Sequence, residues 1–231
     1  LAKNMGKAVI LRLTTHVCHA KERVAFSGWT VASEPDNTPR FDPANGPYIP
    51  LVSAVYPKKR KALADLPQVE KWLDDRKLHR IVANNSHRGI IVSGMVYLSV
   101  EEVLASLADK PDILKLASVY PVPSRAIVDF LAAHQEVKVL EELDDTLEKE
   151  VKALAYDQRL NVRILGKAAL EDWVGEYTPD KVRDILHQTW PGSIPARKSL
   201  VAGAAAAILP RPPQMCPGCG HRSAFHAIKQ A

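Results

Sequence analysis

The sequence predicts an α/β fold in which a parallel sheet has helices on both faces. Short apolar runs typical of buried strands recur at 80–83, 89–93, 113–117, 137–141 and 162–165. Helical spacing of apolar residues follows most of them, at 95–108, 124–133, 145–154 and 179–187. Strands that alternate with helices across short links favour parallel pairing, because each helix crosses over one face of the sheet.

The residues before this alternation are expected to form three segments. The apolar run 8–11 predicts a buried strand that delivers Arg12, Thr14, Thr15 and His16 at its end. Prolines at 35, 39, 43, 47, 50 and 57 exclude regular structure and predict an extended connector. Helical spacing of apolar residues returns at 58–77, and Pro67 is expected to weaken or interrupt this helix.

Two helix starts and one linker can be placed from residue type. Ser124 is a candidate N-cap, as is Thr178, which precedes Pro179 at the first helical position. After Trp190 a run rich in Pro, Gly and Ala leads to Arg211-Pro212-Pro213 and predicts a linker. No internal repeat is found in the sequence.

Composition narrows the classes of protein. The sequence has 231 residues, of which 46% are hydrophobic and 25% charged, as in ordinary globular proteins. No apolar stretch is long enough for a membrane span. The run 8–13 is too short for a signal peptide. Because the sequence starts with Leu1 and not with Met, it is expected to begin inside a longer protein. Three cysteines make no disulfide framework and favour a reducing, cytoplasmic environment.

The net charge of +5 is unevenly placed along the sequence. All of the surplus lies after Trp190, in Arg197, Lys198, Arg211, Arg222 and Lys229. Such a segment can face a phosphate or an acidic partner, but a basic linker whose acidic neighbours lie elsewhere in a longer protein is the favoured interpretation. Nucleic-acid binding is not predicted, because no recognised motif or interleaved aromatic residue accompanies these basic residues.

Two predicted strand ends carry candidate sites, since ligands of open parallel sheets collect there. Ser93-Gly94 leads straight into a helix whose N–H groups could hold an anion, but tight strand-to-helix packing is favoured. The acidic residues Glu141, Glu142, Asp144 and Asp145 could hold a metal or act as an acid–base pair. A helix N-terminus stabilised by acids is the favoured interpretation.

Cys18 lies between His16 and His19, which suggests a thiol next to a base. No partner spacing supports a catalytic triad, so a structural role is favoured here. Catalytic residues therefore stay unassigned.

The motif Cys216-Pro217-Gly218-Cys219-Gly220-His221-Arg222 is the strongest functional signal. Pro and Gly reverse the backbone between the thiols, so that two sulfurs can converge on one metal. Three kinds of site fit this motif. It could be half of a zinc site with His221 as a ligand, or half of an iron–sulfur site. It could also be a Gly-rich turn that binds a diphosphate beside Arg222. A redox dithiol is less favoured, because a long linker and no thioredoxin-like strand precedes it.

Five ordered stretches, at 11–16, 89–97, 114–123, 139–143 and 211–222, together carry a family resemblance. Their order and spacing cover nearly the whole chain. In these stretches the chain resembles the alpha (large) subunit of indolepyruvate ferredoxin oxidoreductase. That enzyme belongs to the thiamine-diphosphate-dependent 2-oxoacid:ferredoxin oxidoreductases.

The resemblance implies a layout in three parts. Residues 1–55 are expected to be the end of a pyrimidine-binding domain plus the Pro-rich connector. Residues 56–190 are expected to be a transketolase C-terminal-like α/β domain, and 191–231 a linker and the start of the thiamine-diphosphate-binding domain. The two outer parts are expected to be incomplete, so that the chain is an internal fragment.

The resemblance also implies an activity: oxidative decarboxylation of aryl pyruvates to aryl-acetyl-CoA, with ferredoxin as electron acceptor. The implied cofactors are thiamine diphosphate, Mg²⁺ and [4Fe-4S] clusters, and the implied partners are the beta (small) subunit, ferredoxin, coenzyme A and the aryl pyruvate. Cys216 and Cys219 are the implied cluster ligands, and Gly218, Gly220, His221 and Arg222 complete the implied cofactor-binding set.

The family's Gly-Asp-Gly magnesium segment, its ferredoxin-like cysteine repeats and its acidic residue that activates thiamine are all absent from this sequence. The fragment alone is therefore expected to be inactive. The alternative hypothesis is a non-catalytic α/β module whose Cys-x-x-Cys binds zinc for protein association.

Overall fold

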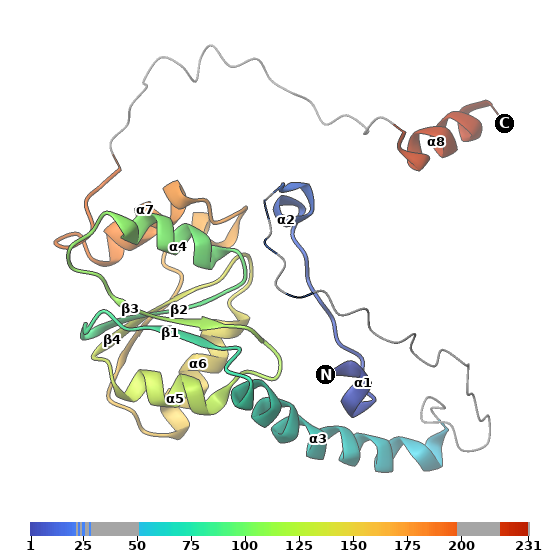
Figure 1. Ribbon diagram of the computed structural model, residues 1–231, viewed down its shortest axis with the longest axis horizontal. Helices are drawn as coiled ribbons and strands as arrows, with labels where there is room; N and C mark the ends of the chain where they lie inside the picture. The colour runs from blue at the N-terminus through green and yellow to red at the C-terminus, as the bar shows by residue number, and fades with distance from the viewer. Residues whose placement is uncertain (22, 24, 26–27, 29–50, 198–217, 231) are drawn as a thin grey trace. The chain divides into compact units, whose positions relative to one another are not determined.

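A computed structural model of the chain describes all residues except 22, 24, 26–27, 29–50, 198–217 and 231 (Figure 1). The chain divides into two compact units, Leu1–Ala196 and Arg197–Ala231, and each is described by itself. The predicted linker residues 198–217, including Arg211-Pro212-Pro213 and Cys216, lie outside the described residues, as does most of the predicted Pro-rich connector.

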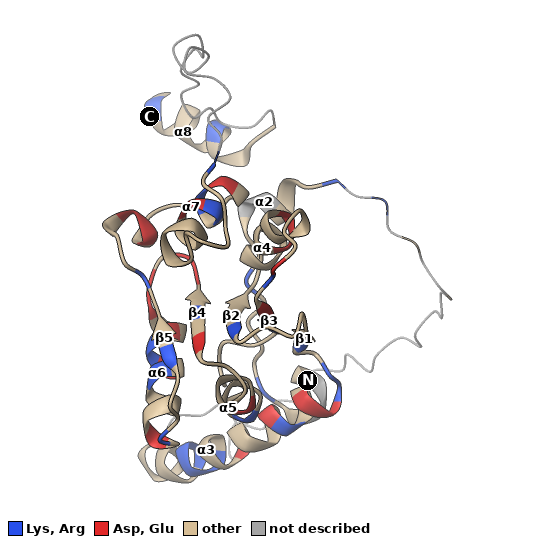
Figure 2. Cartoon of the chain, turned by 90° about the vertical axis from the view of Figure 1, so that its left-hand side faces the viewer, with Lys and Arg blue, Asp and Glu red and all other residues tan. Residues whose placement is uncertain are grey.

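A five-stranded, mostly parallel sheet forms the centre of the first unit, as expected for an α/β fold. Its strand order is β1-β3-β2-β4-β5. The strands are β1 Arg80–Val82, β2 Arg88–Ser93, β3 Asp112–Leu116, β4 Glu136–Leu140 and β5 Arg163–Leu165. All five agree with the predicted strands to within one residue at each end, and Figure 2 shows β2 and β4 pointing the same way.

The first strand is an exception to the parallel pairing. β1 pairs antiparallel with β3, with Ile81 opposite Leu114, whereas the β2–β3, β2–β4 and β4–β5 pairs are parallel. Only a short loop joins β1 to β2, and it contains no helix that could cross over the sheet. β1 therefore runs against its neighbour at the edge of the sheet, where an antiparallel strand is common.

Helices cover both faces of the sheet (Figure 1). The helices α4 Val96–Ala105 and α7 Pro179–Thr189 lie on one face, and α5 Ser124–Ala132 and α6 Thr146–Asp157 lie on the other. Successive residues of β2 point to opposite faces, so Ile90 and Val92 enter the α4–α7 core while Ile91 enters the α5–α6 core. These fully buried β-branched side chains explain the short apolar runs seen in the sequence.

The long helix α3 runs from Val52 to Asp75. The expectation of irregular structure as far as Pro57 is wrong for residues 52–57, and Pro67 does not break the helix. Each proline removes one backbone hydrogen bond, and packing offsets that loss in the C-terminal half, where Val69 and Leu73 are buried. Figure 2 shows charges of both signs along this helix.

One of the two expected helix caps is confirmed. The Thr178 side chain accepts a hydrogen bond from Lys181 N at 3.4 Å, with Pro179 at the helix start. Ser124 is instead the first residue of α5, and Pro123 holds the cap position. The Ser124 N–H is satisfied from another element, because it donates to the carboxylate of Glu70 on α3.

The predicted strand at residues 8–11 is wrong. This run has no regular structure, and Ile10 and Leu11 are 93% and 80% exposed. No strand of the sheet pairs with it, and an apolar run without a pairing partner gains no ladder hydrogen bonds. Short helices α1 Ala2–Met5 and α2 Thr15–His19 flank it.

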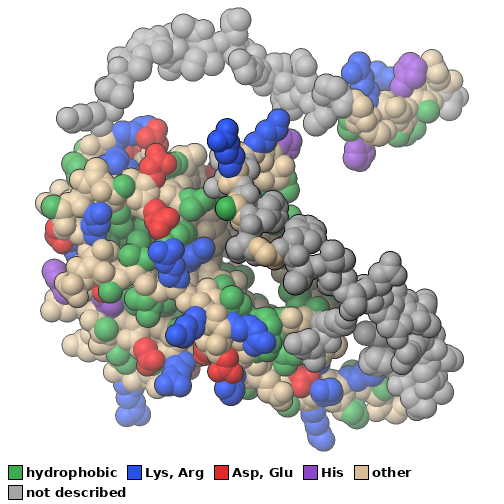
Figure 3. All heavy atoms as spheres, in the orientation of Figure 1, with side chains coloured by type: hydrophobic (Ala, Val, Ile, Leu, Met, Phe, Trp, Pro, Cys, Tyr) green, Lys and Arg blue, Asp and Glu red, His purple; other side chains and the backbone are tan. Residues whose placement is uncertain are grey.

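Charged side chains of both signs lie on the face drawn in Figure 3. Within the described ranges, no helix combines the length and the apolar character that crossing a membrane requires. The second unit contributes one described helix, α8 Gly220–Gln230, none of whose residues is buried.

Candidate functional site

The described part of the Cys-x-x-Cys motif begins at Gly218, where the backbone takes a left-handed φ of 78°. This conformation suits glycine and turns the chain into α8, as the sequence predicts. The Arg222 N–H donates to the Cys219 carbonyl at 3.1 Å and closes the first turn.

Two ligand-type side chains meet at this turn. Cys219 is a partly exposed free thiol, and its Sγ lies 3.6 Å from Nδ1 of His221. Thiolate and imidazole are the groups that zinc and iron–sulfur centres use, so the donor set fits both. Within the part of the chain that the structure describes, no three His, Cys, Asp or Glu side chains gather in a metal-binding geometry. The roles predicted for Cys216, Gly218, Cys219, Gly220, His221 and Arg222 stay predictions.

At the carboxyl edge of the sheet, Glu141 caps the N-terminus of α6. Its two carboxylate oxygens accept from Leu147 N at 2.9 Å and from Glu148 N at 2.7 Å. Burial raises the pKa of Glu141, and these two N–H donors oppose the rise. The helix N-terminus interpretation of the acidic cluster is therefore correct for this residue.

Two further acids of the cluster, Glu142 and Asp145, also have structural partners. Glu142 accepts from Tyr177 N at 2.8 Å, and Asp145 forms an ion pair with Lys149 at 2.8 Å. Their carboxylates are thus directed to separate elements, and no shared metal site forms among them. Gly94, in the other candidate turn, has a φ of 63°, and α4 begins two residues later. That tight connection is what close strand-to-helix packing requires.

A lysine network links the loops that follow β4 and β5. Lys167 Nζ donates to the carbonyl oxygens of Glu141 and Asp172, the latter at 3.0 Å, and to the Tyr177 hydroxyl at 2.9 Å. The Tyr177 hydroxyl in turn donates to the Asp172 carbonyl at 2.7 Å. Burial raises the pKa of Tyr177 well above its ordinary range, so this hydroxyl stays protonated.

Gly166 allows this network to form. A Cβ on Gly166 would lie 1.8 Å from Oε1 of Glu148, whose other oxygen accepts from Lys167 N at 2.9 Å. Sequence reasoning did not find this network, because its members come from several elements. The sequence signal that could have pointed to this region is Lys138, which is the one charged residue within the apolar run 137–140.

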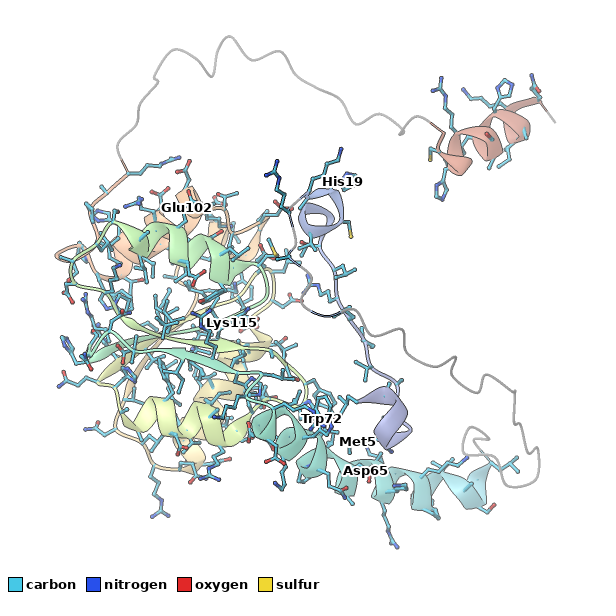
Figure 4. The ribbon with its side chains drawn as sticks, viewed as in Figure 1. Met5, His19, Asp65, Trp72, Glu102 and Lys115 are labelled. Atoms are coloured by element: carbon cyan, nitrogen blue, oxygen red, sulfur yellow. The ribbon has the colours of Figure 1, made fainter. Side chains whose placement is uncertain are left out.

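In the first unit, residues from the polar segment at 12–16 and from the acidic cluster at 141–145 line one hollow. Arg12, Leu13 and Thr14 line a hollow of about 340 Å³ with Glu142, Leu143, Gly175 and Glu176. Thr14 also caps α2 by accepting from Val17 N at 3.4 Å. Cys18 is an exposed free thiol on α2, the helix that ends at His19 (Figure 4). No hydrogen bond between His19 and this thiol is found among the described residues. The His16 side chain lies outside the described residues, so the structural interpretation of Cys18 stays a prediction.

No family model matches the chain. Among curated proteins, it is 31% identical over 228 residues to indolepyruvate oxidoreductase subunit IorA of Methanothermobacter marburgensis, which covers 96% of this chain and 35% of that protein. It is 29% identical over 235 residues to the subunit of the same name from Methanothermobacter thermautotrophicus, and 28% identical over 239 residues to that from Pyrococcus abyssi.

The last two matches cover 100% of this chain and 37% of each relative. The chain thus spans little more than a third of the length of the curated relatives that it matches. The resemblance that the five sequence stretches indicated is confirmed at the level of the family.

Proposed function

Because the chain is related along its whole length to indolepyruvate oxidoreductase subunit IorA, we propose that it is part of the large subunit of such an oxidoreductase. The proposed reaction is the thiamine-diphosphate-dependent oxidative decarboxylation of aryl pyruvates. Carbon dioxide leaves, the acyl group is transferred to coenzyme A, and the electrons pass to ferredoxin. The proposed partner is the small subunit of the same enzyme.

The observation that supports this proposal is the match to three subunits of one name from different organisms, which extends over 96–100% of this chain. We further propose the layout expected above: the end of a pyrimidine-binding domain at 1–55, a transketolase C-terminal-like domain at 56–190, and the start of the diphosphate-binding domain at 191–231. In this layout the five-stranded sheet is a scaffold.

In the proposed enzyme Cys216 and Cys219 hold a [4Fe-4S] cluster, and Gly218, Gly220, His221 and Arg222 surround it or the cofactor diphosphate. The free, partly exposed thiol of Cys219 supports this assignment. A bound cluster would accept and release single electrons. The exposed guanidinium of Arg222, one helical turn from the thiol, is suited to a phosphate oxygen.

The test uses the full-length subunit, prepared without oxygen together with its small subunit. We expect ferredoxin reduction that requires both indolepyruvate and coenzyme A. Cys219→Ala should abolish this reduction, while Cys18→Ala, which removes the other free thiol among the described residues, should leave it unchanged. A cluster-loaded complex that turns over no aryl pyruvate would contradict the proposal.

The zinc module is the second candidate, because a mixed pair is already in place: Cys219 Sγ lies 3.6 Å from the His221 ring. Metal analysis of the same preparation separates the two functions. Iron with acid-labile sulfide supports the oxidoreductase, and zinc alone supports the module.

A further inference from the structure

Lys138 on β4 is a buried cation with no carboxylate at ion-pair distance among the described residues. It is 3% exposed and lies in register between Ile90 on β2 and Leu165 on β5. Its ammonium donates to the Gly166 carbonyl at 2.6 Å. Across the described residues, neither an ion pair nor a second hydrogen bond to this ammonium is found, although an ammonium has three donors.

The neighbouring lysine shows the contrast. Lys167 Nζ has three acceptors, namely two carbonyl oxygens and the Tyr177 hydroxyl. Glu148, a buried acid of the same region, is paired with Lys152. Lys138 is thus left with donors to spare, whereas the Lys167 ammonium has three acceptors and the Glu148 carboxylate has an ion pair.

The ammonium borders a cavity of about 350 Å³ under α7. Apolar side chains of Ile164, Leu165 and Ile185 form one part of its wall. The polar part consists of Lys138, Gly166, Lys167, Ala168, Asp172, Gln188 and Thr189. A cavity of this volume has room for a small molecule with one charged end and a short apolar end.

Burying an unpaired charge is unfavourable, and a bound counter-ion removes most of that cost. Burial lowers the pKa of Lys138, while the carboxylates of Asp172 and Glu148 raise it without reaching ion-pair distance. An anion placed beside the ammonium would take up its free donors and hold it in the charged form.

We propose that this cavity binds a short-chain aliphatic monocarboxylate, with the carboxylate on Lys138 and the chain against Ile164, Leu165 and Ile185. Asp172 lines the same cavity, so a singly charged ligand fits better than a dianion. This inference concerns the sheet domain alone and does not depend on the proposed oxidoreductase activity.

Thermal unfolding of the full chain in sodium butyrate tests the proposal, with ionic strength held constant by sodium chloride. A saturable rise in Tm is expected, of roughly 3 °C at ten times the dissociation constant. In parallel, amide chemical shifts should move at residues 166–168 and 188–189, which border the cavity, and sodium phosphate should produce a much smaller effect.

Lys138→Met keeps the length of the side chain without its charge and should abolish the butyrate response. Lys149→Met is the matched control, because Lys149 is an exposed lysine of α6 outside the cavity, and its response should equal that of the wild type. If Lys138→Met does not fold, the chemical shifts of the wild type decide.

Three results would overturn the proposal. They are a response to butyrate that does not saturate or persists in Lys138→Met, chemical-shift changes confined to other residues, and an equal response to phosphate. The last result would show that the cavity selects charge alone and has no preference for a carboxylate with an apolar chain.

Discussion

The carboxyl edge of the sheet and the N-terminus of α8 both carry groups capable of chemistry, but they use them differently. At the sheet edge, Glu141 caps α6 and the Lys167 ammonium has three protein acceptors. On α8 every residue is exposed, and Cys219 has the His221 ring as its neighbour. Polar groups at the sheet edge hold loops in place, whereas those of α8 are free to meet a ligand.

The difference shows that dense polar sequence is a poor guide to function when its partners are unknown. The acidic run at 141–145 has the composition of a metal site, yet its carboxylates cap a helix, bind a backbone N–H and pair with a lysine. The short Cys-x-x-Cys motif contributes nothing to a buried core in the described residues. The carboxylates of the first region therefore have structural roles, whereas chemistry at the second region is what we propose.

The largest effect should come from Gly166→Ala. The added Cβ would lie 1.8 Å from Glu148 Oε1, so the carboxylate must leave its place and give up its bond to Lys167 N. We expect a loss of about 3 kcal/mol in the free energy of unfolding, measured by urea denaturation. Gly192→Ala is the control, because its Cβ meets nothing within 4 Å. Equal stability of the two variants would contradict the packing described here.

Glu141→Gln should have an intermediate effect. The amide keeps one acceptor for the start of α6 but loses the charge and the second acceptor, which should cost about 1–2 kcal/mol. Glu150→Gln makes the same chemical change at an exposed position of α6 and should be nearly neutral. In the full-length enzyme kcat should be retained. A large fall in kcat with an unchanged melting temperature would show that Glu141 takes part in catalysis and would contradict its structural role.

A smaller, pH-dependent effect is expected from His79, which follows α3. Its Nδ1 accepts from Ala117 N at 3.1 Å, and its Nε2 is buried without a hydrogen-bond partner among the described residues. Burial lowers the pKa of His79 from 6.5, and the charges of Asp74 and Glu70 oppose this. The unfolded chain therefore binds a proton first, and stability should fall as the pH drops below about 6.5.

Replacing His79 by asparagine keeps a hydrogen-bond acceptor for Ala117 N but removes the group that titrates. His79→Asn should therefore remove up to about 1 kcal/mol of the acid destabilisation between pH 7 and pH 5. Melting temperatures measured across this range provide the test. If the variant loses as much stability as the wild type between pH 7 and pH 5, other groups control the acid destabilisation.

The sheet could be predicted from sequence because its strands are short apolar runs bounded by helical patterns. Ile90, Ile91 and Val92 are fully buried, and such runs are visible without tertiary information. The run at 8–11 has the same composition but no pairing partner, and pairing is a non-local property. The antiparallel β1 was missed for a related reason, since residue type does not encode direction.

The site could be predicted only where one segment holds all of its parts. The turn at Gly218 and the neighbouring ligands Cys219 and His221 lie within a few residues, so the motif is visible. The lysine network joins positions 141, 148, 167, 172 and 177, and only folding brings them together. The close approach of Gly166 to Glu148 is likewise a product of the tertiary structure.

The most direct test of this division of roles is the iron and acid-labile sulfide content of the full-length subunit, prepared without oxygen. Wild type, Cys219→Ser and Glu141→Gln are compared in one series. We expect Cys219→Ser to lose the iron and sulfide of one cluster, whereas Glu141→Gln should retain them and melt at a lower temperature. Full iron content in Cys219→Ser, or zinc in place of iron in the wild type, would contradict it.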